Sequence, residues 1–159
     1  MVYSFARVGA VVRMRIGDYF DDGRRSWFRF HEKGGKRHEV PAHHNAADYM
    51  DAYLEAAGIA AEKKSPLFRS IDRHRTLTGR PLDPRNALDM IKRRAKAAGL
   101  SEAIGNHTFR ATGITAYRAN GGTLEHAQEI ANHASPKTTK LYDRTSDLIT
   151  LDEVEKIKI

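Results

Sequence analysis

The sequence predicts an α+β fold that is mainly α-helical and has a small three-stranded antiparallel sheet near the N-terminus. Two observations lead to this expectation. Between residues 14 and 41, apolar residues alternate with polar ones and two glycine-containing turns interrupt them, a pattern typical of β-hairpins. From residue 45 onward, apolar residues recur every three or four positions, as on the buried face of an amphipathic helix.

Composition restricts the class of protein. The 159 residues are 40% hydrophobic and 30% charged, which suits one soluble domain with one core. Twenty-seven Lys and Arg against 20 Asp and Glu give a net charge of +7, which favours a polyanionic partner such as nucleic acid. The absence of cysteine excludes disulfides, thiolate zinc sites and cysteine nucleophiles. Neither a membrane-spanning apolar run nor a signal-peptide pattern is present, so we expect a cytoplasmic protein.

The first helix is marked by an apolar stripe at helical spacing, which consists of Phe5, Val8, Val11 and Val12. No capping residue precedes this stripe, and we therefore expect that the chain is N-terminally truncated. Alternation then predicts three strands, near residues 14–19, 26–32 and 37–41.

The middle of the chain is predicted to be helical and strongly basic. A helix over residues 45–57 ends at Gly58, where glycine suits the left-handed C-cap. Residues 63–81 read as a polar connection with the apolar pair Leu67-Phe68 as its anchor. Asp83-Pro84 caps the next helix, whose buried stripe is expected to be Leu88, Ile91, Ala95 and Ala98. Eleven Lys and Arg and three Asp between residues 63 and 96 give this segment a net charge of +8.

Three further helices and a tail complete the prediction. Asn106 is expected to cap a helix that ends at residues 120–122, and a short helix over 123–131 follows. Ser135-Pro136 begins a helix that contains Tyr142. Residues 146–159 form a C-terminal tail segment, in which a capping box at Thr150 starts a last helix that needs a surface to dock on.

Three familiar kinds of site are excluded by spacing. The glycine turn beside Lys33 lacks the phosphate-binding P-loop pattern, His126 and His133 lack a third zinc ligand, and no Gly-x-Ser-x-Gly elbow is present. The candidates that remain are Arg7, Lys33, His107, Arg110, His133 and Tyr142. Taken singly, each of these residue types more often serves a solvated surface, a helix cap or the core.

Taken together, the C-terminal candidates resemble the active-site pattern of the tyrosine recombinases, the phage-type integrase family. The residues that carry the likeness are His107-Thr-Phe-Arg110, then His133 after a small helix, and Tyr142 nine residues later. Upstream, Ala6-Arg7-Val8 looks like the first active-site arginine of the family. The run Glu-Lys33-Gly-Gly-Lys-Arg looks like its lysine-bearing hairpin. The resemblance covers the chain from about residue 4 to its end.

The resemblance implies a tyrosine recombinase catalytic-domain fold and a site-specific DNA recombinase or integrase. Strand cleavage and rejoining would proceed through a 3′-phosphotyrosyl intermediate at Tyr142, without cofactor or metal. The chain would be a single C-terminal catalytic domain, residues 1–159, without the DNA-clamping domain. It would bind double-stranded DNA in the bacterial cytoplasm or nucleoid and self-associate there, with the tail as a contact. Two positions depart from the family pattern: Ala10, where an acidic residue is frequent, and Asn132, where glycine is usual.

The chemistry of the candidates agrees with this expectation. Guanidinium groups bind phosphate oxygens bidentately, which suits Arg7 and Arg110 to a phosphodiester that gathers negative charge during cleavage. An imidazole such as His107 can accept the proton of Tyr142, and Lys33 can supply one to the leaving oxygen. Two alternatives stay open from the sequence: a truncated fragment that binds DNA or a partner without cutting, and a type IB topoisomerase.

Overall fold

Helices dominate the chain, and a small antiparallel sheet lies near its N-terminus, as predicted. The computed structural model describes residues 1–32 and 35–143, so Lys33 and the tail segment 146–159 lie outside the described residues. The strands are β1 (Tyr19–Asp21), β2 (Ser26–His31), β3 (Arg37–Pro41), β4 (Arg69–Ile71) and β5 (Leu77–Pro81). The helices are α1 (Val8–Val12), α2 (His44–Ala57), α3 (Pro84–Ala97), α4 (Asn106–Ala119), α5 (Leu124–Ala131) and α6 (Pro136–Lys140), with a 3-10 turn, η1, at Ile16–Asp18.

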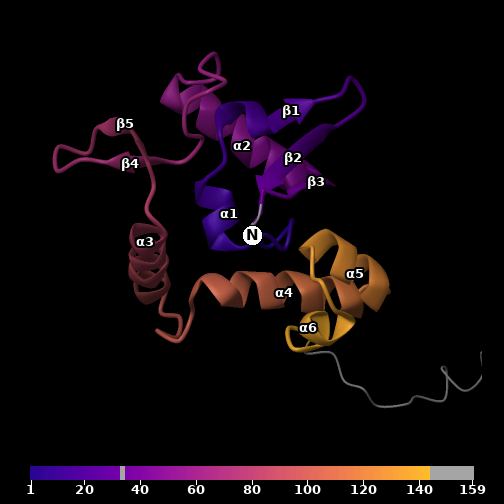
Figure 1. The fold of residues 1–159 in the computed structure, drawn as a ribbon. Helices are drawn as coiled ribbons and strands as arrows, with labels where there is room; N and C mark the ends of the chain where they lie inside the picture. The colour runs from indigo at the N-terminus through magenta and orange to yellow at the C-terminus, as the bar shows by residue number, and fades with distance from the viewer. Residues whose placement is uncertain (33–34, 144–159) are drawn as a thin grey trace, which may run out of the picture.

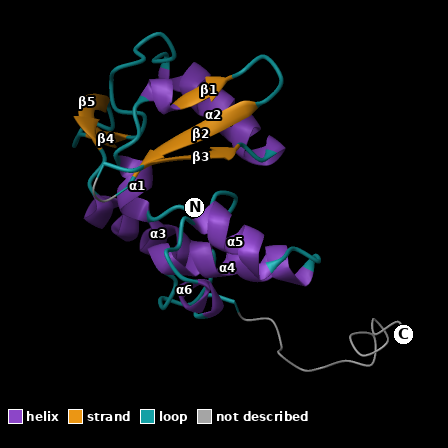
Figure 2. Ribbon diagram, turned by 45° about the vertical axis from the view of Figure 1, so that its right-hand side comes forward, coloured by secondary structure: helices purple, strands orange, loops and turns teal. Residues whose placement is uncertain are grey.

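Two parts of the molecule face each other (Figure 1). One consists of the sheet β1-β2-β3 with α1 and α2, and the other of α4, α5 and α6, while α3 leads from β5 to α4. The same division is visible from a second direction (Figure 2). Each part has an apolar cluster of its own, and Phe5 from the N-terminal segment belongs to the cluster around Ile114 in α4. The N-terminal segment therefore ties the two parts together.

The first predicted strand is only partly correct. Met14 and Ile16, the apolar residues of its alternating pattern, are buried as predicted, with 2% and 0% exposure. The backbone, however, turns at η1 before β1 begins at Tyr19, because the Asp18 carboxylate accepts a 2.8 Å hydrogen bond from the Arg15 N–H. A side chain that bonds its own backbone in this way competes with strand pairing.

The prediction that Phe5 belongs to the apolar stripe of the first helix is wrong. The helix α1 spans only Val8–Val12, and Phe5 lies outside it with a φ of 48°. Arg7, in extended conformation, is the residue that precedes the helix. The side chain of Phe5 is thereby free to leave the direction of α1 and enter the other cluster.

The segment predicted as a polar connection contains a hairpin, β4–β5, that the sequence did not suggest. Asp72 closes its turn, since its carboxylate accepts from the N–H groups of His74 and Thr76 at 2.9 Å. Arg75 takes a φ of 63° in that turn. The expected apolar anchor is confirmed, because Leu67 is fully buried.

The later helices begin and end close to the predicted residues. Gly58 is left-handed with a φ of 64°, and Asp83 caps α3 through a 2.7 Å bond from the Arg85 N–H. Three details are wrong: Ala98 is exposed and Ala87 fills the core instead, Gly105 rather than Asn106 precedes α4, and α6 ends before Tyr142. At the start of α4, the Gly105 N–H donates to the Thr108 hydroxyl at 3.0 Å.

At Gly113, α4 and the N-terminal segment lie in close contact. A Cβ atom there would lie 2.2 Å from the Val2 carbonyl oxygen and 2.8 Å from Cε1 of Phe5. Helix propensity alone favours alanine over glycine by about 1 kcal/mol, but overpacking costs roughly 1–3 kcal/mol or more. We therefore expect Gly113→Ala to lower the free energy of unfolding, measured by urea denaturation. Gly79→Ala, where a Cβ meets nothing within 4 Å, is the control, and equal effects of the two changes would contradict this account.

Candidate active site

A cavity of about 560 Å³ lies between α1 and the first turn of α4. It is lined by Arg7, Val8, Gly9, Ala10, Arg13, Glu32, Asn106, His107 and Arg110. Arg7 and Arg13 flank α1 at its two ends, while His107 and Arg110 project from the same face of α4. The local fold thus brings together side chains that are a hundred residues apart in the sequence.

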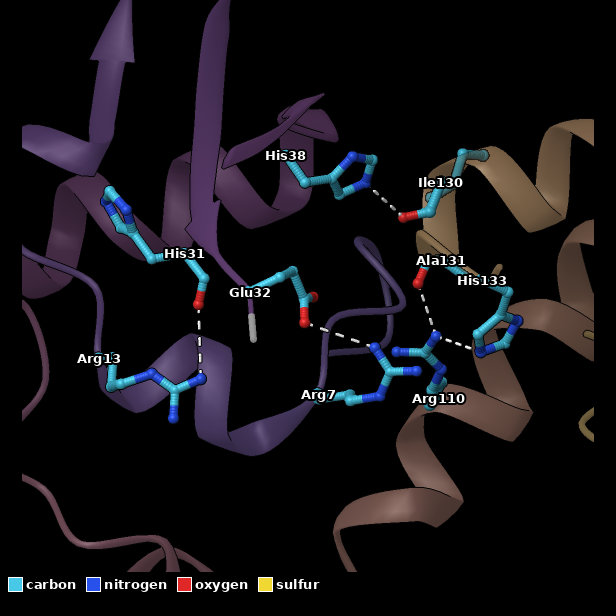
Figure 3. A network of polar contacts seen from close by, with 9 residues as sticks. All are labelled: Arg7, Arg13, His31, Glu32, His38, Arg110, Ile130, Ala131 and His133. Carbon is cyan, nitrogen blue, oxygen red and sulfur yellow. Dashed lines mark hydrogen bonds and ion pairs between the residues drawn. The ribbon is translucent and has the colours of Figure 1, made fainter. Parts of the chain in front are cut away.

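Arg110 forms the floor of this cavity and is 1% exposed. Its Nη2 donates to the Ala131 carbonyl at 2.7 Å and contacts Nε2 of His133, as Figure 3 shows. The buried atoms Nε and Nη1 have no hydrogen-bond partner. Burial, and secondly repulsion from Arg7, lowers the pKa of Arg110 to about 10, so it stays charged at neutral pH. A charged guanidinium with two unsatisfied donors is suited to bind an anion.

His133 directly follows the C-cap of α5, where Asn132 adopts a left-handed conformation with a φ of 48°. Because Arg110 can only donate, Nε2 of His133 accepts from it, and the ring proton resides on Nδ1. Nδ1 then donates to the Thr139 hydroxyl at 2.8 Å. Burial first, and then the charges of Arg110 and Arg7, lowers the pKa of His133 to about 4. His133 is therefore neutral at physiological pH and orients Arg110.

The neutral state of His133 makes the stability depend on pH. The pKa of His133 falls from 6.5 to about 4 on folding, so between these values the unfolded state binds more protons. This contribution is complete above pH 6.5 and is lost as the pH falls towards 4, with a slope of up to about 1.4 kcal/mol per pH unit. We expect His133→Gln to flatten the fall in unfolding free energy between pH 7 and pH 5, measured in urea. The exposed His126→Gln should keep the wild-type slope, and identical slopes in all three proteins would refute the assignment.

Tyr142 contacts three of the other candidates. Its ring stacks on His133 with centroids 5.6 Å apart and on His107 with centroids 6.2 Å apart. The guanidinium carbon of Arg110 lies 5.5 Å from the ring centroid, within the range of a cation–π interaction. The phenol oxygen lies 3.4 Å from Nδ1 of His107, a long hydrogen bond. Such a bond in a free enzyme can tighten when substrate binds.

Arg7 forms an ion pair with the carboxylate of Glu32. Its Nη1 lies 3.4 Å from Oε2 of Glu32, whose side chain is only 12% exposed, at the end of β2 (Figure 3). The acidic partner of Arg7 is therefore Glu32, which directly follows the last residue of β2. Glu32 also offsets the mutual repulsion of Arg7 and Arg110.

The sheet is joined to the floor of the site through α5. Nε2 of His38, in β3, lies 3.0 Å from the carbonyl oxygen of Ile130, and the next carbonyl, that of Ala131, is the acceptor for Arg110. Figure 3 shows these contacts side by side. The carbonyl end of α5 is thus fixed from one side by the sheet while it holds Arg110 from the other.

The structure assembles five of the six candidates, and Lys33 lies outside the described residues. Three polar residues that line the cavity were not selected from the sequence, namely Arg13, Glu32 and Asn106. The only sequence signal for Arg13 is Gly9 four residues earlier, over which its guanidinium folds back.

Among residues 1–32 and 35–143, no three His, Asp or Glu side chains are grouped to hold a metal ion. In the same residues, every helix is too short or too polar to cross a bilayer.

Comparison with known proteins agrees with this geometry. The sequence pattern that defines the phage integrase family matches residues 1–148. The chain belongs to the phage integrase family. Family members among its relatives include the tyrosine recombinase XerC of Corynebacterium efficiens, 29% identical over 140 residues, covering 88% of this chain and 42% of the relative. XerC of Thermodesulfovibrio yellowstonii is 31% identical over 122 residues, covering 77% of this chain and 40% of the relative.

Solved structures of recombinases share the phage integrase fold seen here. The crystal structure of XerA recombinase superposes with a TM-score of 0.76 at 24% identity, covering 98% of this chain and 53% of that one. XerH bound to its difH substrate gives a TM-score of 0.71 at 19% identity, covering 98% and 43%. The chain spans less than half the length of the two XerC relatives.

Proposed function

We propose that this chain is the catalytic domain of a site-specific DNA recombinase or integrase that cuts and rejoins strands through Tyr142. The observation that carries the proposal is the contact of the Tyr142 ring with His107, Arg110 and His133, beside a cavity that also holds Arg7. A nucleophile, a base and two guanidiniums meet there, and this is the set that transfer of a phosphodiester requires. The related XerC recombinases support the assignment.

In the proposed reaction, the scissile phosphate enters the cavity and replaces Glu32 as the partner of Arg7. The phenol oxygen of Tyr142 attacks phosphorus, its proton passes to Nδ1 of His107, and the bond from phosphorus to the 5′ oxygen breaks. Arg7 and Arg110 bind the non-bridging oxygens, where negative charge accumulates. The 3′-phosphotyrosine conserves the phosphodiester bond energy, so attack by a 5′ hydroxyl reverses the steps and joins a strand.

The proposed roles of Lys33 and His133 depend on oxygen atoms of the DNA. We assign to Lys33 the proton that the departing 5′ oxygen takes up, on the strength of its place in the hairpin pattern. His133 is expected to donate to a non-bridging oxygen, which requires Nε2 to release Arg110 and the ring proton to move from Nδ1 to Nε2. Until then His133 serves to position Arg110.

The proposed partner is double-stranded DNA, on which copies of the chain associate. Ten of the eleven Lys and Arg between residues 63 and 96 are exposed, which suits contacts to phosphates. Among the structural neighbours, a lambda integrase fragment is a dimer bound to a core site, which supports self-association on DNA. We propose the tail segment 146–159 as one of the contacts between copies.

The experiment that tests the proposal incubates the chain with a pool of nicked duplexes of random sequence. Cleavage near a nick releases a short fragment, so the covalent adduct cannot reverse and survives denaturing electrophoresis. We expect an adduct whose modified peptide contains Tyr142, and sequencing of the attached DNA reports the preferred site. Duplex binding without any adduct would favour the non-cleaving fragment and overturn the proposal. Relaxation of supercoiled DNA without sequence preference would instead favour a type IB topoisomerase.

A further inference from the structure

Arg13 is a third guanidinium in the candidate site that a single phosphate does not need. One phosphodiester offers two non-bridging oxygens, and Arg7 and Arg110 together already supply enough donors for both. Arg13 lines the same cavity, is exposed, and makes no ion pair with any described carboxylate. Its charge is therefore available for another anion.

The position of Arg13 is set by the fold. It follows the last residue of α1, and its Nη2 donates to the His31 carbonyl at 3.4 Å, across the end of β2 (Figure 3). A Cβ atom on Gly9 would lie 3.4 Å from Nη1, so the guanidinium lies directly over the helix backbone where glycine leaves room. Arg7 and Arg13 are six residues apart, about 9 Å along a helix axis.

Arg13 also lines a second hollow, of about 500 Å³, at the C-terminal end of α1. This hollow contains two further exposed cations, Arg15 and Lys64, against one carboxylate, Asp83, which precedes α3. Arg13 thus lies on the ridge between the candidate site and a second basic hollow. A polyanion that runs from one to the other passes over its guanidinium.

We propose that Arg13 binds the DNA phosphate next to the scissile phosphate on the same strand, and so fixes which phosphate reaches Tyr142. The inference rests on the proposed function, since it takes DNA as the ligand of the cavity. Arg13 is a binding residue in this scheme and takes no part in proton transfer.

The test pairs protein variants with chemically altered DNA. Affinity is measured for a duplex that carries one neutral methylphosphonate, placed in turn at the scissile phosphate and at each neighbouring phosphate. With the wild-type chain, neutralising the adjacent phosphate should weaken binding about tenfold, as expected for loss of a charge-assisted hydrogen bond. With Arg13→Gln the same change in the DNA should have no further effect. Arg13→Lys keeps the charge and should recover part of the sensitivity.

Arg24→Gln is the matched control, because Arg24 is an exposed arginine in the β1–β2 turn that lines neither hollow. It removes one charge and should leave the effect of the methylphosphonate unchanged. The salt slope of log Kobs should fall in magnitude by about 0.9 for Arg13→Gln. Equal sensitivity of the wild type and Arg13→Gln to every methylphosphonate would overturn the inference while adduct formation at Tyr142 stood. Failure of the wild type to bind any duplex would overturn both.

Discussion

Tyr142→Phe is expected to abolish the covalent protein–DNA adduct completely while leaving fold and DNA affinity unchanged. The phenol oxygen is the proposed nucleophile, and no other hydroxyl is assigned to attack. The ring itself is retained, so stacking on His107 and His133 and the contact with Arg110 persist. The lost hydroxyl makes one long hydrogen bond, of 3.4 Å, and its removal changes stability by no more than about 0.5 kcal/mol.

Adduct yield on nicked duplexes, affinity for intact duplexes and urea unfolding measure these three outcomes. Tyr117→Phe is the control, since Tyr117 lies on α4 in the apolar cluster of Phe5 and lines no part of the cavity. An adduct that persisted in Tyr142→Phe would assign the nucleophile to another residue. Loss of the adduct in Tyr117→Phe as well would show that the assay reports the packing of α4 rather than the chemistry.

Helical spacing was sufficient to predict that two of the six candidates lie together. His107 and Arg110 lie three residues apart, and the structure confirms that they face the same cavity. The approach of Arg7 to Arg110 is different in kind, because periodicity contains no information about contacts between residues 103 positions apart. That pairing was available only from the resemblance to a family whose arginines occur in this order.

Glu32 and Arg13 show what local patterns leave out. Glu32 stands beside Lys33 in the recognised hairpin, yet its ion pair with Arg7 depends on how β2 is placed over α1. Arg13 is six residues from Arg7, and residues at this spacing lie on different faces of a helix. It reaches the cavity because the helix has ended and Gly9 lacks a side chain. Both residues enter the site through tertiary packing.

The errors in secondary structure have local causes of another sort. The alternation of Met14 and Ile16 correctly predicted burial, but a buried residue need not be in a strand, and the Asp18 carboxylate closes a turn instead. The β4–β5 hairpin was missed because its strands are short and polar, and because Asp72 organises the turn with a left-handed Arg75. In each case an aspartate bound to nearby backbone N–H groups decides the conformation.

Arg110→Lys is expected to reduce the rate of adduct formation by at least about 100-fold, with a smaller loss of DNA affinity. A lysine has one ammonium group, which can satisfy the Ala131 carbonyl or approach the phosphate, but cannot present the fork that does both. The buried site also has its own positive neighbour in Arg7, and both burial and that charge lower the pKa of a lysine more readily than that of an arginine. The variant would therefore have fewer hydrogen-bond donors and a smaller fraction of its side chains in the charged form.

Single-turnover cleavage under saturating protein separates this loss from weaker binding, and Arg69→Lys provides the matched control. Arg69 is also largely buried, with its side chain 9% exposed, and it too donates to a carbonyl, that of Pro66, at 3.3 Å. It lies outside the cavity, so its replacement tests the cost of an arginine-to-lysine change without touching the proposed phosphate site. A fall in stability common to both variants reports burial, whereas a fall in cleavage rate confined to Arg110→Lys reports the unsatisfied Nε and Nη1. Equal cleavage by Arg110→Lys and the wild type would mean that those two donors do not meet the transition state, and that the guanidinium serves only to join α4 to the end of α5.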